Sequence, residues 1–556
     1  LGANIDASAT NNWNPDGSGA YYGFAPIGTL NNRFNGRLDG LGHTITALFI
    51  ERPVTNFVGL LGYVGQTGVV QNLGLVSGSV HGQDYVGGIT GTNDGLINNV
   101  YVTSAVSGNI DVGGLIGINY ASVVNTYATG TVTARGSNSG GLIGINFGTL
   151  TQSYAENTVN GTGVVGGLVG FNGDTGVVTY AYATGAVTGD ALDVGGLVGV
   201  NFGQISYVHS TNSQVKSNSG ENVGGLVGSN GDGGSISYAY ADTAVVGSSG
   251  VGGLAGQNQG SVNYAYATGS VYGGHYIGGL VGTNSGNGVI NNTYSLSAVH
   301  GYFEVGGLVG ANAGNIINSY AAGVVVGETT DSVGGLLGFA EGGSSISNSF
   351  WDTEISQQAN SAGGTGLTTA QMHTQSHFSS WDFNDTWVIY EGNTNPLLRS
   401  FMTLLTVTPN DASKTYDGQT YDGGAGVRYS LTPNSSLSGT LIYESGINAG
   451  SHTIVLSGLY SNQQGYLIQY VDGTLAIAKA SYTAVSGTKT YDGNANFASG
   501  TLTGVNGEQF TLSDLMADSA NASVNNGASK FIDYTGSITG LNGADSGNYN
   551  LTLSSL

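Results

Sequence analysis

Rings and amides recur along this sequence at regular spacing, and together they are the groups that recognise carbohydrate. An exposed aromatic face desolvates the C–H face of a sugar, while amides bond its hydroxyls. Each ring in the main series follows an apolar residue by four positions, as Tyr182 follows Val178. The series is Tyr101, Tyr127, Tyr154, Tyr182, His209, Tyr240, Tyr266, Tyr294, Tyr320 and Phe350.

Three segments carry a second tyrosine two residues before the first, and these are the densest candidates for binding an extended polysaccharide. They are Tyr180 and Tyr182, Tyr238 and Tyr240, and Tyr264 and Tyr266. Four residues of extended strand return to the same face, so we expect the rings to share the side of the apolar anchors and to pack in the core. If the chain bends between anchor and ring, the rings instead form an outward platform. His209 is interpreted as a ring-shaped substitute for tyrosine.

The sequence shows no catalytic set, so we expect no enzyme, no catalytic residue and no cofactor. His373 and His377 would share a helix face at the i, i+4 spacing of a zinc site if Thr368 caps a short helix, but no glutamate lies between them. A surface helix is the preferred interpretation, and no metal site is predicted. Asp174 and Asp232 follow Asn-Gly pairs and could contribute to a weak Ca²⁺ site.

The elements that must position these groups are set by an internal repeat. A block resembling Val-Gly-Gly-Leu-Val-Gly recurs eleven times, at intervals of 26 to 29 residues. Such a period indicates units that bury their apolar faces only by stacking on one another. The blocks open at Val58, Val86, Val112, Ser139, Val165, Val194, Val223, Val251, Ile277, Val305 and Val333.

One unit, residues 223–250, contains three short runs of strand-forming residues separated by Gly, Asn, Asp and Ser. Helix is excluded, since each Gly costs about 1 kcal/mol relative to Ala. The sequence therefore predicts an all-β fold, a parallel β-solenoid (β-helix) of about eleven 28-residue coils followed by small all-β modules. At about 4.8 Å for each coil, the rod is on the order of 50 Å long.

An asparagine stands two residues beyond the block in nine successive units, and the first and last units replace it with Val64 and Ala340. Asparagine tolerates a left-handed backbone, and its amide can bond the same amide one coil away. A structural ladder is therefore preferred over a row of amides that grasps a glycan. The nine are Asn93, Asn119, Asn146, Asn172, Asn201, Asn230, Asn258, Asn284 and Asn312.

The amino-acid composition disfavours several classes of binding partner. The 556 residues include 11 Lys and Arg against 34 Asp and Glu, so the formal charge is −23. So few basic residues disfavour nucleic acid and anionic lipid as partners. Membrane insertion is not expected, because no apolar run reaches 18 residues. The absence of Cys excludes a disulfide framework. The first residues, Leu1 to Asp6, read as the middle of a strand, so we expect a longer parent protein.

The repeats resemble the GLUG repeat of very large bacterial surface and secreted proteins. Residues 4–45 are similar to the segment that opens a GLUG array, and Phe350-Trp351-Asp352, residues 366–372 and Trp381-Asp382-Phe383 are similar to the segment that closes one. The resemblance implies an N-terminal solenoid segment over 1–57, the repeats over 58–345 and a C-terminal cap over 346–402.

From about Leu404 the period changes. Lys414-Thr415-Tyr416-Asp417-Gly418 recurs 75 residues later as Lys489-Thr490-Tyr491-Asp492-Gly493. This signature resembles the YDG and MBG modules of bacterial adhesins, which implies one MBG/YDG-like module over 403–479 and a second, truncated YDG-like module over 480–556. Each could be an immunoglobulin-like sandwich or a β-grasp-like unit. The whole arrangement is similar to filamentous-haemagglutinin-like exoproteins of the two-partner secretion type.

That resemblance implies an adhesin segment of an extracellular or cell-surface bacterial protein, with roles in cell adhesion and biofilm. Its implied partners are a polysaccharide or cell-surface glycan, or a second copy of the protein, and an outer-membrane transporter during export. Two alternatives stay open. The chain could be a passive spacer with the binding site elsewhere in the parent protein, or part of a secreted peptidase.

Overall fold

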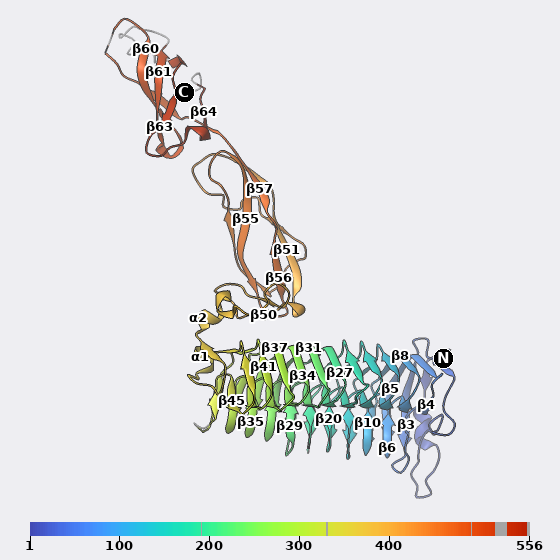
Figure 1. Cartoon of the computed structure of the whole chain (residues 1–556). Helices are drawn as coiled ribbons and strands as arrows, with labels where there is room; N and C mark the ends of the chain where they lie inside the picture. Colours follow the sequence, from blue (N-terminus) through green and yellow to red (C-terminus); the bar gives the residue numbers. More distant parts are fainter. Residues whose placement is uncertain (191, 330–331, 491, 518–530, 553–556) are drawn as a thin grey trace. The chain divides into compact units, whose positions relative to one another are not determined.

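The computed structural model describes residues 1–190, 192–329, 332–490, 492–517 and 531–552. It divides into two compact units, Leu1–Pro396 and Leu397–Leu556. The first unit is a parallel β-solenoid of about eleven coils, so the predicted fold class is confirmed. In Figure 1 the coils follow one another in sequence order, from blue at the N-terminal end to yellow at the last repeat.

A representative coil shows how one repeat is used. It runs through β20 (Val165–Gly166), β21 (Val169–Asn172), β22 (Val177–Thr179), β23 (Tyr182–Ala183) and β24 (Val187–Gly189). Strands equivalent to β20 form a 10-stranded sheet and those equivalent to β21 an 11-stranded sheet, while the remaining strands join a 27-stranded sheet. Each strand pairs in parallel with its equivalent one repeat away, so each repeat position becomes a column along the rod.

The glycines of the repeated block allow two of these sheets to touch through their backbones. A Cβ atom on Gly166 would lie 1.9 Å from the carbonyl oxygen of Val169, and one on Gly170 would lie 2.9 Å from the backbone nitrogen of Ser139 in the 10-stranded sheet. No side chain fits at such separations. The Gly-Gly-Leu-Val-Gly sequence is therefore the signature of a tight bend between the 10-stranded and the 11-stranded sheet.

The interior is one continuous hydrophobic cluster that extends from Ile45 to Trp351. Each coil contributes the residue that opens its block, such as Val165, and the Leu and Val within the block, such as Leu168 and Val169, all fully buried. Because a single coil has no other side on which to bury these residues, its stability depends on both neighbours.

The nine asparagines form one buried column at the end of the 11-stranded sheet. Each of the first eight donates a hydrogen bond from its side-chain nitrogen to the side-chain oxygen of the next, at 2.7–2.8 Å. The same amides also donate to a carbonyl of their own turn, as Asn201 does to Gly203 at 3.2 Å. The column thus joins the coils and closes their turns.

Segments at both ends cover the rod. At the N-terminal end, β1 (Ile5–Asp6) and β2 (Arg37–Asp39) pair with β3 (Thr44–Glu51) and β5 (Val69–His81) in the 27-stranded sheet. After the last repeat, the cap contains α1 (Thr353–Ser356), β48 (Thr365–Leu367) and α2 (Thr369–Met372). The solenoid unit ends at Pro396, six residues before the boundary expected at 402.

The second unit consists of two small β modules. In the first, β51 (Thr403–Pro409), β53 (Val427–Tyr429) and β56 (Tyr466–Tyr470) form one sheet. A second sheet contains β52 (Ala412–Thr415), β54 (Leu437–Glu444), β55 (Gly450–Ser461) and β57 (Gly473–Ala478). Residues 403–479 are all described and contain no helix, so this module resembles the sandwich alternative.

The second module consists of one sheet and a separate pair of short strands. β59 (Ala484–Ser486), β60 (Asn496–Thr503), β61 (Gln509–Ala517) and β62 (Phe531–Tyr534) form one sheet, in which β63 (Ile538–Gly540) also pairs with β61. β58 (Ala480–Ser481) pairs separately with β64 (Tyr549–Asn550).

The Lys-Thr-Tyr-Asp-Gly motif forms an ion pair in both modules, since Lys414 contacts Asp417 and Lys489 contacts Asp492, each at 2.7 Å. Tyr416 is buried and donates a hydrogen bond to Glu508 of the second module at 2.8 Å. The motif therefore supplies a contact between the modules. Tyr491 lies outside the described residues. Within the described ranges, no helix has both the length and the apolar composition to cross a bilayer.

One carboxyl group is buried in the solenoid wall. Asp111 in β10 (Ile110–Gly113) is 5% exposed, and its carboxylate accepts a hydrogen bond from Asn138 at 2.8 Å. Burial raises the pKa of Asp111 to about 6, and the nearby Asp84 charge adds to the rise. The folded protein therefore holds a proton on this group at pH values where the unfolded chain has released it.

Replacing Asn201 by alanine should lower the free energy of unfolding by about 1–3 kcal/mol, because it leaves the side-chain nitrogen of Asn172 and the side-chain oxygen of Asn230 without their 2.8 Å partners in a buried site. Urea denaturation followed by circular dichroism measures the change. The matched control is Asn287→Ala in an exposed turn, which should stay within about 0.5 kcal/mol of the parent. Equal effects from both variants would show that the column adds nothing.

The raised pKa of Asp111 predicts a contribution to stability that is fully present below about pH 4 and is lost as the pH rises through about 6. Asp111→Asn should remove this slope and raise the urea midpoint at pH 8 more than at pH 4.5. Parallel denaturation curves at the two pH values measure the difference. A substitution that changes the midpoint equally at both would contradict the assigned proton.

Candidate functional site

A left-handed residue in every coil decides where the tyrosines point. It lies two positions after the apolar anchor and has a φ of 46–55°. The anchor itself is buried, as Val178 is, and the residue after the bend returns to the core, as Ala181 does. The bend therefore moves the following ring to the opposite face. The left-handed residues are Asn72, Asn99, Asn125, Gln152, Tyr180, Tyr207, Tyr238, Tyr264, Asn292, Asn318 and Asn348.

The main ring series consequently lies outside the core, and the expectation that rings and anchors share one face is wrong. From Tyr101 to Tyr320 neighbouring rings stack with centroids 4.8–5.1 Å apart and planes within 2–9°. Offset stacking of this kind stabilises each pair by about 0.5–1.5 kcal/mol. His209 continues the stack between Tyr182 and Tyr240, as its interpretation as a ring substitute requires.

Access to this series varies along the rod. Tyr182 and Tyr240 are half-buried, whereas Tyr266 is only 3% exposed and Tyr294 and Tyr320 are fully buried. Six tyrosines are predicted above as ligand contacts. For Tyr266 this prediction is wrong, because its ring is not accessible to a ligand.

A second ring column stands at the bend itself and is more exposed. It consists of Tyr180, Tyr207, Tyr238 and Tyr264, stacked at 4.8–5.0 Å with planes within 5–10°. Tyr180 is 60% exposed and Tyr207 is 47% exposed. The sequence interpretation missed Tyr207, although the signal was present, because it precedes His209 by the two positions that separate the tyrosine pairs.

Amides continue this column on its N-terminal side. Asn99 donates to Asn72 at 2.8 Å, Asn125 donates to Asn99 at 3.3 Å, and Gln152 stands between Asn125 and the first ring. The outer strip, defined as Asn72, Asn99, Asn125, Gln152, Tyr180, Tyr207, Tyr238 and Tyr264, thus joins four amides to four stacked rings in successive coils.

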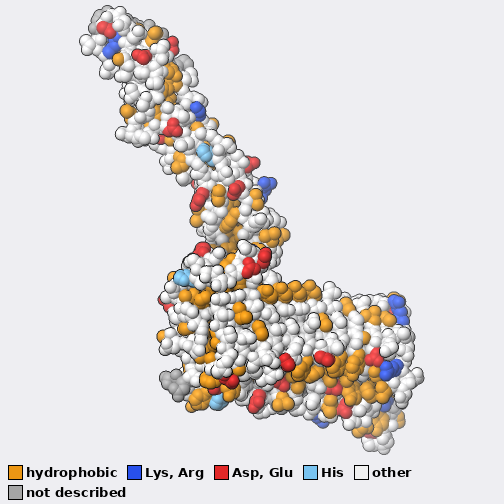
Figure 2. Space-filling model, viewed as in Figure 1, with side chains coloured by type: hydrophobic (Ala, Val, Ile, Leu, Met, Phe, Trp, Pro, Cys, Tyr) orange, Lys and Arg blue, Asp and Glu red, His pale blue; other side chains and the backbone are white. Residues whose placement is uncertain are grey.

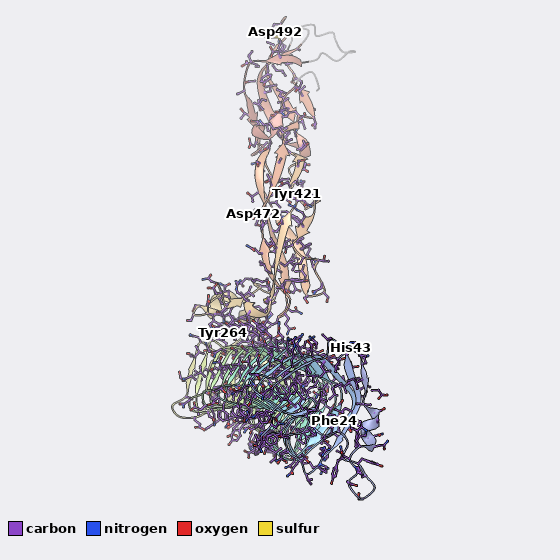
Figure 3. The ribbon with its side chains drawn as sticks, turned by 90° about the vertical axis from the view of Figure 1, so that its right-hand side faces the viewer. Phe24, His43, Tyr264, Tyr421, Asp472 and Asp492 are labelled. Atoms are coloured by element: carbon purple, nitrogen blue, oxygen red, sulfur yellow. The ribbon has the colours of Figure 1, made fainter. Side chains whose placement is uncertain are left out.

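The cap closes the C-terminal end of the outer strip. Trp387 in β49 (Trp387–Val388) donates to the side-chain oxygen of Asn292 at 3.2 Å and contacts the rings of Tyr294 and Tyr320. The Tyr320 hydroxyl donates to the carbonyl of Pro396 at 2.8 Å. In Figure 3, Tyr264 lies on the side of the solenoid nearest the cap.

The side chains of the outer strip carry no charge in neutral solution. Burial, and then the neighbouring Tyr264 and Tyr207, raise the pKa of Tyr238. Its hydroxyl therefore stays protonated in neutral solution and both donates and accepts hydrogen bonds. Burial also lowers the pKa of His209, so its ring favours the uncharged form that stacks well between two tyrosines. Such a surface suits hydroxyl-rich ligands.

The other candidate groups do not come together. Thr368 caps α2 as expected, but that helix ends at Met372, so His373 and His377 do not share one helix face. No group of three or more metal-ligating side chains occurs in the described part of the chain. Asp174 and Asp232 lie in turns two coils apart, about 10 Å along the rod at the usual strand spacing. One Ca²⁺ ion, with oxygen ligands at about 2.3–2.6 Å, cannot reach both.

Comparison with known proteins identifies one module. Residues 405–476 match the family described as MBG domain (YGX type). A stretch of 110 residues is 43% identical to "Halomucin" of Haloquadratum walsbyi, covering 18% of this chain and 1% of that protein. Another of 83 residues is 45% identical to a "Putative Gly-rich membrane protein" of Evansella cellulosilytica, covering 14% of this chain and 10% of that protein. No solved structure matches.

The stacked position of His209 predicts an acid-sensitive point in the ring column. Because burial lowers its pKa, the unfolded chain binds a proton more readily, and stability should fall as the pH drops below about 6.5. His209→Tyr should restore a continuous tyrosine stack and raise the thermal midpoint more at pH 5 than at pH 8. Calorimetry at both values tests this. A gain that is larger at pH 8 would contradict the lowered pKa.

Proposed function

We propose that this chain is an adhesin segment of a secreted or cell-surface bacterial exoprotein and that the outer strip binds an extended polysaccharide lying along the rod. The proposal rests above all on one observation. Four successive coils place a tyrosine outside the core at a backbone position that disfavours it, and the side chains of two of them, Tyr180 and Tyr207, are exposed to solvent.

A left-handed conformation costs an ordinary residue about 1–2 kcal/mol, whereas asparagine adopts it more readily. The other coils use six asparagines and one glutamine at this position. Tyr180, Tyr207, Tyr238 and Tyr264 accept the cost together, in consecutive coils, and gain no burial in the core. Strain retained at an exposed position supports a role in binding.

The geometry of the outer strip fits a polymer better than a small molecule. Rings repeat every 4.8–5.0 Å on parallel planes, so they present one continuous aromatic ridge. A polysaccharide can place sugar C–H faces against this ridge while the amides from Asn72 to Gln152 meet hydroxyls further along.

The comparisons support a location outside the cell. An MBG domain and limited similarity to proteins named as a mucin and as a membrane protein fit a surface or adhesin-like repeat protein. The GLUG character of the repeats, a filamentous-haemagglutinin-like arrangement, passage through an outer-membrane transporter and a role in biofilm belong to the proposal and rest on the sequence resemblance. The proposal includes no catalytic step and no cofactor.

A passive spacer is the second candidate. The continuous core and the buried asparagine column support it, because both make a stiff rod whether or not the surface binds anything. Under this alternative, the exposed rings of the outer strip would have no ligand. Among the residues that the structure describes, we find no arrangement that favours the peptidase alternative over these two.

The test replaces Tyr180, Tyr207, Tyr238 and Tyr264 together by asparagine, the residue that most other coils use at this position. Thermal stability should be unchanged or higher, since the backbone strain is relieved. Binding to an array of immobilised neutral and acidic polysaccharides should fall by roughly tenfold or more, because the four rings together should contribute about 1–3 kcal/mol of stacking free energy to binding.

The matched control is Tyr272→Asn with Tyr302→Asn, two tyrosines outside the outer strip that are 53% and 45% exposed. It should leave polysaccharide binding intact. If the 556-residue chain without substitutions binds no polysaccharide and no copy of itself, the spacer alternative replaces the proposal. Equal losses in the test and control variants would also contradict a site at the outer strip.

A further inference from the structure

A second aromatic surface lies on the 11-stranded sheet, away from the outer strip. Its rings are Phe147 after β16 (Ile143–Asn146), Phe171 within β21, and Phe202 after β26 (Val198–Asn201). The centroid of Phe171 lies 6.3 Å from that of Phe147 and 5.8 Å from that of Phe202. With Asp174 and Asp232 they line a hollow of about 470 Å³, called here the aromatic groove.

Glycines fix the rings of the aromatic groove. A Cβ atom on Gly173 would lie 2.3 Å from the Phe147 ring, and one on Gly231 would lie 2.4 Å from the Phe202 ring. Phe147 and Phe202 therefore each pack against the glycine of the next coil, where a larger residue would displace the ring. Phe202 is nevertheless 39% exposed. The floor of the groove is thus aromatic, rigid and open to solvent.

Two carboxylates border the aromatic groove. Asp174 and Asp232 are exposed, and an oxygen of Asp174 accepts a hydrogen bond from the backbone of Thr175 at 2.9 Å. The surrounding charge has the same sign, since Arg135 and Lys216 are the only basic residues of the sequence between positions 53 and 396. Figure 2 shows acidic side chains beside hydrophobic ones on the visible face of the solenoid. A ligand for the groove should therefore be cationic.

The chain itself shows which cation suits such a surface. Tyr63 in β4 (Leu61–Val64) occupies the same column as Phe171, because strand pairing aligns Tyr63, Thr92, Ile118, Ile145 and Phe171 in register. The guanidinium of Arg33 lies 4.2 Å from the centre of the Tyr63 ring and contacts Asp94 at 2.6 Å. An N-terminal segment thus already places an arginine against a ring and a carboxylate in this column.

We propose that the aromatic groove is a docking site for an extended arginine-containing peptide, whose guanidinium groups stack on the phenylalanine rings and pair with Asp174 and Asp232. Arginine suits this surface better than lysine, because its planar group stacks on rings and binds carboxylates through two parallel hydrogen bonds. The two carboxylates lie two coils apart, about 10 Å. In the polyproline II conformation, which rises about 3.1 Å per residue with three residues per turn, side chains at positions i and i+3 of an extended peptide share one face and have about the same separation.

The test uses the full chain and a synthetic peptide built from Gly, Ser and Thr, with arginines at positions 4 and 7. Fluorescence anisotropy at low ionic strength should detect binding that weakens as salt is added. A peptide with citrulline at both positions keeps the shape but lacks the charge, and it should bind roughly tenfold more weakly or not at all. A peptide with arginines at positions 4 and 5, which point to different faces of a polyproline II peptide and lie only about 3 Å apart along it, should also bind less tightly.

Two protein variants locate the site. The double variant Asp174→Asn with Asp232→Asn should weaken peptide binding by roughly tenfold, because it removes two exposed ion pairs that act beside the cation–π contacts. Glu156→Gln with Asp242→Asn removes the same number of exposed charges elsewhere and should leave binding nearly unchanged. Since all four residues are exposed, none of the substitutions should shift the melting temperature.

Four outcomes would overturn the proposal. Equal weakening by both double variants would mean general attraction to an acidic protein. Equal binding of the arginine and citrulline peptides would mean an apolar contact that does not depend on the charge of the peptide. Binding of a deacetylated amino-sugar polymer, with none of either peptide, would make the groove a carbohydrate site instead. Phe171→Ala should weaken arginine-peptide binding, and unchanged affinity in that variant would also exclude the groove.

Discussion

The in-register stacking of the coils, fixed by the buried asparagine column, is the constraint on which the rest of the solenoid depends. Every amide in the column uses its side-chain oxygen and nitrogen at once, between neighbouring coils and toward its own turn. A shift by one residue would place an apolar side chain in this buried row and leave polar groups unpaired. The hydrophobic core favours stacking in general, but the amides select one register.

Fixed register converts the repeat into columns, and each column can be used differently. One column, from Val112 through Val165, is core. Another, at the left-handed bend, carries asparagine in most coils and tyrosine in four. A third places Tyr63 and Phe171 in line along the 11-stranded sheet. New surface chemistry therefore needs only side-chain replacement at an exposed position, with the backbone unchanged. This is how one rod can carry two different candidate surfaces.

The termini of the solenoid show what the exposed columns are suited to contact. The cap lays Trp387 on Tyr294 and Tyr320, and the N-terminal segment lays Arg33 on Tyr63. In both cases a segment of the same chain covers an aromatic column, by ring contact in one and by cation–π and ionic contact in the other. Tyr180, Tyr207, Tyr238 and Tyr264 form the column next to that of Tyr294 and Tyr320, and Phe171 belongs to the column of Tyr63. These rings present the same kind of aromatic group as the two contacts within the chain.

The sequence by itself determined the coil. Glycine spacing, strand-forming runs and the recurring asparagine predicted the parallel solenoid and the position of its amide column, because stacking requires the same residue type at the same position in every unit. The sequence could not determine on which face of the strand the rings lie. Counting four residues from Val178 to Tyr182 assumes an extended strand, whereas the left-handed conformation of Tyr180 reverses the face. Only tertiary structure decided which rings the cap buries, and only strand register brought Phe171 into line with Tyr63, since contacts between coils depend on turn lengths that vary from repeat to repeat.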